Sequence, residues 1–99
     1  MLNKDVLQYI GLIMRSRNLA SGEGVLLSIR DKSAKLVIIA EDASDNTKKR
    51  LIDKCTHYKI EYIIIGDSTE LSNAIGKSNR MAIAVLDKKF AEKLKEKIG

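Results

Sequence analysis

The chain alternates short, continuous apolar runs with longer stretches in which apolar residues recur every three or four positions. The continuous runs predict buried strands at 36–40, 61–65 and 81–86, with a brief extended piece at 18–20. The periodic stretches predict helices at 3–16, 21–32, 44–58, 67–75 and 87–98. Strands and helices in alternation, joined by short connections, predict one α/β domain over 1–99: a three-layer α/β/α sandwich with a small mixed central sheet.

Small polar residues stand where each expected helix starts. They are the candidate N-caps Asn3, Ser21, Ser44 or Asp45, Asp67 and Asp87. Glu70 follows Asp67 at capping-box spacing, and Gly76 stands where a glycine ends a helix. These signals place the helix boundaries independently of the apolar pattern.

The central apolar run, Leu36–Ala40, ends abruptly in Glu41 and Asp42. The carboxyl edge of a sheet is where α/β proteins usually carry function, so this exit is expected to belong to the working surface. The two acids have three open roles: acid–base catalysis, capping of the next helix, or accepting hydrogen bonds from a base edge or from backbone. Because no nucleophile or metal ligand stands nearby in sequence, catalysis is the least favoured and an enzyme is not expected.

Composition narrows the class of protein. The chain has 99 residues, of which 44% are hydrophobic and 31% charged, as in a globular domain. No apolar run approaches the ~20 residues that cross a bilayer, and the start lacks a signal-peptide pattern. With a single cysteine, Cys55, no internal disulfide can form, so a cytoplasmic, membrane-free, monomeric protein is expected.

The net charge of +5 favours a polyanionic partner, because binding phosphates releases counterions. The 18 basic residues are divided evenly, nine in each half of the chain, so only folding could gather them into a patch. A basic run, 48–50, opens the third expected helix, where the helix dipole slightly disfavours it. The run therefore weakly indicates a role.

The sequence contains no pattern typical of a metal site, a nucleotide-cofactor loop or a Ser-His-Asp triad. His57 is the single histidine, and with Cys55 it falls short of the four ligands of a zinc site. Ser21-Gly22-Glu23-Gly24 matches neither the Walker nor the dinucleotide-binding glycine pattern. No metal and no cofactor are expected.

Three segments together resemble a known family. The block AKLVIIAEDAS at 34–44, SGEG upstream at 21–24 and IGKSNRMAIAVLD downstream at 75–87 are similar to the ribosomal protein L-seven-Ae superfamily, and closest to its short bacterial YlxQ-type branch. The resemblance covers nearly the whole chain. It implies a small α/β/α sandwich that binds kink-turns, which are sharply bent RNA duplexes with tandem G·A pairs, in ribosomal RNA or another structured RNA of a ribonucleoprotein.

The resemblance also implies two RNA-binding surfaces and a strand end beside them. The residues it assigns to RNA are Ser21, Gly22, Glu23, Gly24, Ser28 and Lys32 around the second helix, Glu41 and Asp42 at the strand end, and Gly76, Lys77, Ser78, Asn79 and Arg80 in the loop before the last strand. In the family the first surface enters the widened groove and the second covers an extruded nucleotide.

The chain departs from the family motif Gly-x-Asn-Glu-x-x-Lys. Two alignments, one residue apart, place Leu27 or Ser28 where the lysine would be, and Glu23 is the one acid in that turn. Losing such a contact costs about 1–3 kcal/mol. The departure leaves open a protein-interaction scaffold on the same fold, while a hydrolase built on Glu41 and Asp42 is the enzymatic alternative.

Overall fold

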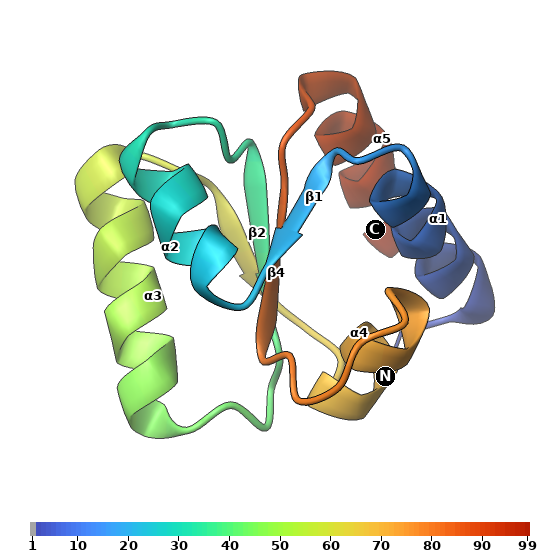
Figure 1. The fold of residues 1–99 in the computed structure, drawn as a ribbon, viewed down its shortest axis with the longest axis horizontal. Helices are drawn as coiled ribbons and strands as arrows, with labels where there is room; N and C mark the ends of the chain where they lie inside the picture. The colour runs from blue at the N-terminus through green and yellow to red at the C-terminus, as the bar shows by residue number, and fades with distance from the viewer. Residues whose placement is uncertain (1) are drawn as a thin grey trace.

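The computed structural model describes residues 2–99 and places four strands in one mixed sheet (Figure 1). The strands are β1 (Leu19–Ser21), β2 (Leu36–Ile39), β3 (Tyr62–Ile64) and β4 (Ala82–Val85), in the order β1-β4-β2-β3. β4 is antiparallel to both β1 and β2, and β2 is parallel to β3. The small mixed sheet expected from the sequence is confirmed.

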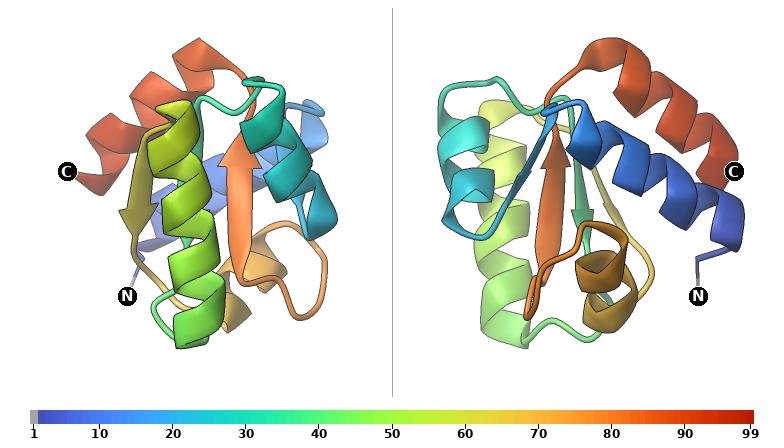
Figure 2. Two further views of the ribbon diagram at one scale, coloured as in Figure 1. Left: turned by 90° about the vertical axis from the view of Figure 1, so that its left-hand side faces the viewer. Right: turned by 45° about the vertical axis from the view of Figure 1, so that its right-hand side comes forward.

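Helices cover both faces of this sheet. They are α1 (Lys4–Arg15), α2 (Glu23–Arg30), α3 (Asp45–Tyr58), α4 (Ser68–Ala74) and α5 (Lys88–Ile98). As Figures 1 and 2 show, α2 and α3 lie against one face, and α1, α4 and α5 lie against the other. The arrangement is the predicted three-layer sandwich. In the described part of the chain, no helix has the length and apolar character needed to cross a membrane.

Strand β2 is buried on both faces, as its continuous apolar run predicts. Leu36 and Ile38 pack into the core under α1, α4 and α5, whereas Val37 and Ile39 pack into the core under α2 and α3. All four side chains are fully buried. Each contributes about 1.5–3 kcal/mol by leaving water, so β2 is the element on which both layers depend.

Four of the five expected N-caps are confirmed, by side-chain oxygens that accept from the backbone of the first helical turn. Asn3, Ser44, Asp67 and Asp87 cap α1, α3, α4 and α5, and Asp67 forms a complete capping box with Glu70. The expectation for Ser21 is wrong. It is the last residue of β1, paired with Ile83, and Gly22 occupies the N-cap position of α2.

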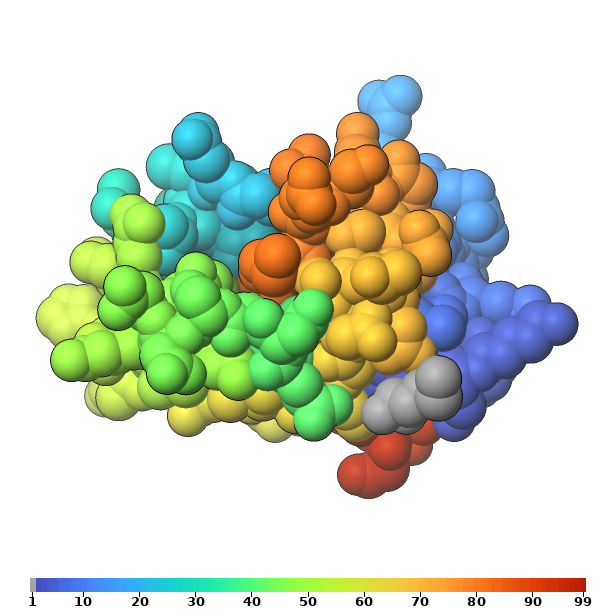
Figure 3. Space-filling model, turned by 90° about the horizontal axis from the view of Figure 1, so that it is seen from below, coloured from blue at the N-terminus to red at the C-terminus, as the bar shows by residue number. Residues whose placement is uncertain are grey.

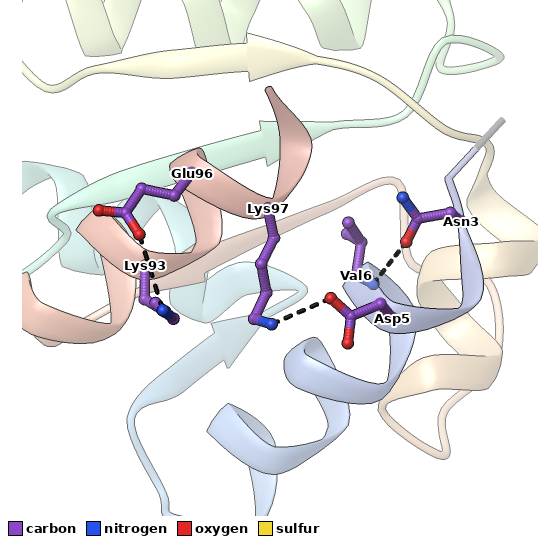
Figure 4. Close-up of polar contacts among 6 residues, drawn as sticks. All are labelled: Asn3, Asp5, Val6, Lys93, Glu96 and Lys97. Carbon is purple, nitrogen blue, oxygen red and sulfur yellow. Dashed lines mark hydrogen bonds and ion pairs between the residues drawn. The ribbon is translucent and has the colours of Figure 1, made fainter.

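Polar contacts join the first and last helices across the same face of the sheet. Lys97 Nζ lies 2.9 Å from Asp5 Oδ2 and also above the ring of Tyr9, which meets Phe90 edge to face (Figure 4 shows the ion pair). The ion pair is exposed and contributes at most about 1 kcal/mol. The apolar packing beneath it is the larger contribution.

The strand directions give the molecule two distinct ends. Because β1, β2 and β3 run one way and β4 the other, the helices α2, α3 and α4 all start at the end where β4 begins. We call this end the site pole; it is at the bottom of Figure 1. The opposite end, the far pole, holds the C-termini of α1, α2 and α3 and the start of α5.

Candidate nucleic-acid interface

Segments far apart in sequence meet around a hollow at the site pole. Seen from below, the start of α2, the first half of α3 and the chain before β4 lie side by side (Figure 3). The hollow between them has a volume of about 260 Å³. Its lining residues are Gly22, Glu23, Val25, Leu26, Thr47, Arg50, Leu51, Asn79, Arg80, Met81 and Ala82. It is smaller than the roughly 300–1,000 Å³ of sites for drug-sized ligands, and thus suits a single planar group.

The start of α2 is built by glycine rather than by a capping side chain. Gly22 has φ +60° and ψ −135°, a conformation that side-chain-bearing residues rarely adopt. No side chain caps this helix. The first backbone N–H groups of α2 are therefore available to an anion at the positive end of the helix dipole, and Glu23 stands exposed beside them.

Arg80 closes the same corner from the other side. A Cβ built on Gly22 would lie 3.4 Å from Arg80 Nη1, so the guanidinium rests directly against the glycine backbone. Among the described residues, Arg80 Nε is a buried donor without a hydrogen-bond partner. A buried, unpaired donor is costly, and the half-buried Arg80 side chain keeps its Nη donors for an acceptor from outside the chain.

The loop that carries Arg80, residues 76–80, is anchored by one buried serine. The backbone N–H of Arg80 donates to Ser72 Oγ at 2.9 Å, and the Ser72 hydroxyl in turn donates to the Arg80 carbonyl at 3.4 Å. Gly76 and Asn79 take positive φ values, 68° and 55°. Two residues of the loop thus have left-handed backbone conformations. The hydrogen bond to Ser72 of α4 fixes the backbone of Arg80 and so sets the position from which its guanidinium extends.

The exit acids of β2 have structural partners. Glu41 Oε2 accepts from the Gly66 backbone at 3.1 Å, and Asp42 accepts from the Ser68 backbone and hydroxyl at 2.8 and 2.7 Å. Two hydrogen bonds hold the pKa of Asp42 below its ordinary value: the one from the Ser68 hydroxyl has the larger effect, and the one from the Ser68 backbone N–H the smaller. Of the roles left open for these acids, the geometry matches the one in which they accept from backbone: they join the end of β2 to the start of α4, and Ser44 caps α3 instead.

Not all the residues assigned to RNA meet at this hollow. Ser28 is buried, and its hydroxyl donates to the Val25 carbonyl at 2.7 Å, so it does not face the surface. Lys32 follows the C-terminus of α2 and lines a different hollow at the far pole. Lys77 and Ser78 line a third, between the 76–80 loop and α4, which Asn79 shares.

The structure distinguishes the two alignments of the family motif. Leu27 is 61% exposed on the outer side of α2, whereas Ser28 is 5% exposed. Of the two, therefore, Leu27 stands where a motif lysine would reach a partner. An exposed leucine at that position removes a charge from the surface and adds an apolar side chain.

Sequence reasoning missed three residues that shape the site. Thr47 and Arg50 of α3 line the hollow, and Ser72 anchors the 76–80 loop from beneath. The basic run at 48–50, which the dipole disfavours, was the available signal for Arg50. No pattern marks Ser72, because its partner lies eight residues away in a loop of irregular backbone.

Metal and thiol chemistry find no site in the described residues. Across residues 2–99, no three His, Cys, Asp or Glu side chains gather closely enough to hold a metal ion. Cys55 is buried on the inner face of α3, and burial raises the pKa of its thiol to about 11. A thiol in that state is inert near neutral pH.

Comparison with known proteins identifies the family of the chain. The family model described as "Ribosomal protein L7Ae/L30e/S12e/Gadd45 family" matches residues 4–95. The chain belongs to this family. Two relatives are each named "RNA-binding protein YlxQ". The Bacillus subtilis protein is 44% identical over 86 residues, which cover 86% of each chain, and the Enterococcus faecium protein is 39% identical over 96 residues, 96% of this chain and 92% of the relative.

Two solved structures share the sandwich. A Bacillus halodurans protein of unknown function superposes with a TM-score of 0.90 at 38% identity, covering 97% of this chain and 98% of its own. The "Giardia lamblia 15.5kD RNA binding protein" superposes with a TM-score of 0.77 at 21% identity, covering 100% and 89%. At that identity the second likeness concerns the fold alone. The resemblance inferred from the sequence blocks is confirmed.

Proposed function

We propose that this protein binds structured RNA of the kink-turn kind and stabilises its bent form. The observation that carries the proposal is the corner where Arg80 rests against Gly22 with its Nε buried and unpaired. The Nη groups of this guanidinium, which lie at the same corner, would donate to an RNA acceptor group. The names of the YlxQ relatives support RNA as the class of partner.

The start of α2 would hold the RNA backbone. Because no side chain caps this helix, its first N–H groups can donate to a phosphate at the positive end of the dipole. These contacts carry no sequence information and fix the orientation of the duplex. Glu23, exposed at the same turn, accepts hydrogen bonds from guanine edges in the G·A pairs.

The hollow beside this turn would receive the nucleotide extruded at the bend. Its volume of about 260 Å³ suits one planar base, and Leu26, Leu51 and Met81 supply apolar lining. Arg80 and the 76–80 loop then cover that base. Recognition is of RNA shape, since the protein selects the kinked conformer and shifts its population.

Family membership supports a ribosome-associated target, either ribosomal RNA or an RNA of ribosome assembly. We extend the proposal to a monomeric protein acting in the cytoplasm without catalysis. The hydrogen bonds that Glu41 and Asp42 already make leave both acids with a structural role, which supports the non-enzymatic assignment.

A titration tests the proposal. The protein is titrated with a kink-turn duplex and with the same duplex carrying G·C in place of its G·A pairs. Tight binding to the first and at least tenfold weaker binding to the second is expected. Equal, steeply salt-dependent binding to both would refute shape recognition and leave only a basic surface.

Two variants locate the site within that assay. Arg80→Lys keeps the charge but loses the planar fork of donors, and Glu23→Gln removes one carboxylate; each should weaken kink-turn binding about tenfold, within the 1–3 kcal/mol of a specific contact. Arg15→Ala, at the end of α1 and away from the hollow, is the matched control and should bind like the parent protein. Unchanged affinity in both site variants would remove the assigned roles.

The exposed Leu27 favours a second candidate, a protein-interaction scaffold on the same fold. A leucine 61% exposed beside the site is a natural anchor for an apolar partner. Leu27→Lys separates the two: it should strengthen kink-turn binding if RNA faces this side of α2, and leave RNA binding unchanged if a protein partner does. Purification with and without nuclease, followed by the absorbance ratio at 260 and 280 nm, gives an independent answer.

A further inference from the structure

The excess positive charge of this protein is concentrated away from the hollow. The connections and helix ends at the far pole carry seven bases and three acids. The bases are Arg17, Arg30, Lys32, Lys35, Lys59, Lys88 and Lys89, and the acids are Asp31, Glu61 and Asp87. Arg15 is left out because its guanidinium folds back to Gly11. The bases come from both halves of the chain, so the patch exists only in the folded protein.

Among residues 2–99, the acids at the far pole form no ion pair with these bases. Asp31 accepts from the Ser33 backbone at 2.9 Å, Asp87 caps α5, and Glu61 pairs with Lys95 of α5 at 2.9 Å. In residues 2–99 the other ion pairs are Lys93–Glu96 and Lys97–Asp5, on α1 and α5 (Figure 4). The seven bases are thus left facing solvent without an acidic partner among the described residues.

Stabilisation of helix ends explains only part of this patch. A lysine or arginine near a helix C-terminus compensates the dipole, which accounts for Arg30, Lys32 and Lys59. Lys88 and Lys89 occupy the first turn of α5, where a positive charge is unfavourable and where that helix has no acid. Like the run at 48–50, this placement weakly indicates a partner.

A hollow gives the patch a centre. Lys32, Lys35 and Lys59 line an opening of about 410 Å³ together with the half-buried ring of Tyr58 and with Glu61, whose carboxylate pairs with Lys95. Lys35 Nζ donates one hydrogen bond, to the Lys32 carbonyl at 3.3 Å, and keeps its other donors free. Three ammonium groups from two connections, α2 to β2 and α3 to β3, around one opening suit a phosphate chain, which bears one charge per nucleotide.

The site pole is different in character. The starts of α2, α3 and α4 and the 76–80 loop carry six acids and five bases. The acids are Glu23, Glu41, Asp42, Asp45, Asp67 and Glu70, and the bases are Lys48, Lys49, Arg50, Lys77 and Arg80. Because this balance is nearly neutral, the hollow there cannot be the main source of electrostatic attraction for RNA.

We propose that the far pole is a second RNA-binding surface, which contacts the phosphate backbone of an RNA helix without reading its sequence. The molecule measures 31 × 27 × 24 Å, so a helix at the far pole is either a distant arm of the RNA bound at the site pole or a second helix. If the helix is a distant arm of the RNA bound at the site pole, this inference rests on the RNA binding proposed above. Binding of an unkinked duplex at the far pole stands independently of it.

The test compares two triple variants that make the same change in net charge. Lys32→Ala, Lys35→Ala and Lys59→Ala are combined in the far-pole variant; Lys4→Ala, Lys54→Ala and Lys93→Ala are combined in the control. The probes are a kink-turn with short arms, the same kink-turn with one arm extended, and an unkinked RNA duplex. Each is titrated across a range of salt concentrations.

The far-pole variant should bind the short kink-turn like the control but bind the unkinked duplex about tenfold more weakly. The slope of log affinity against log salt for that duplex should fall by about two to three. If the far-pole variant also loses affinity for the extended kink-turn, the far pole contacts a distant arm of the same RNA. If a labelled duplex binds to a preformed complex of the protein with the short kink-turn, the far pole contacts a second helix. Equal behaviour of the two triple variants on every probe would overturn the proposal. Failure of the proposed function is distinct, because it appears as equal binding to the G·A and G·C kink-turns.

Discussion

Ser72→Ala is the sharpest test of how the 76–80 loop is positioned. The substitution removes one oxygen that is buried under the loop and accepts the Arg80 backbone N–H at 2.9 Å. It changes neither the net charge nor any side chain at the surface. Any effect on RNA therefore reports the position of the loop rather than the loss of a direct contact.

The size of the effect follows from the unpaired donor. Leaving a buried N–H without a partner costs about 1–3 kcal/mol, and the weaker bond to the Arg80 carbonyl at 3.4 Å is lost as well. We expect the free energy of unfolding to fall by about 1–2 kcal/mol, which lowers Tm by roughly 4–8 °C for each kcal/mol in a domain of this size. Urea unfolding monitored by circular dichroism measures the loss, with an unchanged m-value.

Binding should fall as well, since the guanidinium at the hollow is displaced. Affinity for the kink-turn is expected to drop about tenfold while its salt dependence stays that of the parent protein, because no charge is removed. The matched control is Thr56→Ala, which removes an exposed hydroxyl of α3 away from the hollow and should match the parent in both assays. If Ser72→Ala and Thr56→Ala unfold and bind alike, the anchoring role is wrong.

Three further outcomes are expected. Gly22→Ala should lower the free energy of unfolding by about 1–3 kcal/mol, because the backbone of Gly22 is at φ +60°; urea unfolding measures this loss. It should also weaken RNA binding, measured by titration, more than Gly76→Ala does, because the methyl group added at Gly76 meets nothing within 4 Å. Because the pKa of Asp42 is lowered in the folded protein, its stabilising contribution is present above about pH 4 and is lost as the pH falls through the folded pKa. Asp42→Asn should therefore flatten the acid limb of a plot of Tm against pH. An unaltered limb would contradict the assignment. Cys55, whose pKa is about 11, should resist iodoacetamide at pH 8 in the native protein and react in urea, as mass spectrometry would show.

Patterns of short range predicted most of the fold. The N-caps Asn3, Ser44 and Asp87 each act on the turn that follows, so sequence spacing alone locates them. The burial of β2 on both faces follows from its continuous apolar run. Both kinds of signal depend on residues a few positions apart, so they can be recognised without knowledge of the tertiary structure.

The errors arise where tertiary contacts decide. Ser21 has the composition of an N-cap, but pairing with Ile83 draws it into β1 and shifts the cap to Gly22. Ser28 points inward because the helix face that it shares with Val25 packs against the sheet. The family resemblance assigns Lys32 to the same RNA surface as Glu23, whereas the length of α2 places it at the far pole, where it belongs to the second surface proposed above.

The charge distribution is the property that sequence could least supply. Nine bases in each half gave no reason to expect a patch, and the fold places seven of the 18 at the far pole. On the two proposals made above, attraction to RNA and recognition of its shape are carried by different ends of one small sandwich. Salt should then act mainly on contacts at the far pole, whereas exchanging G·A for G·C pairs should act only on contacts at the site pole. A protein in which both dependences vanished with one triple substitution would have a single interface, and the division of labour between the poles would be wrong.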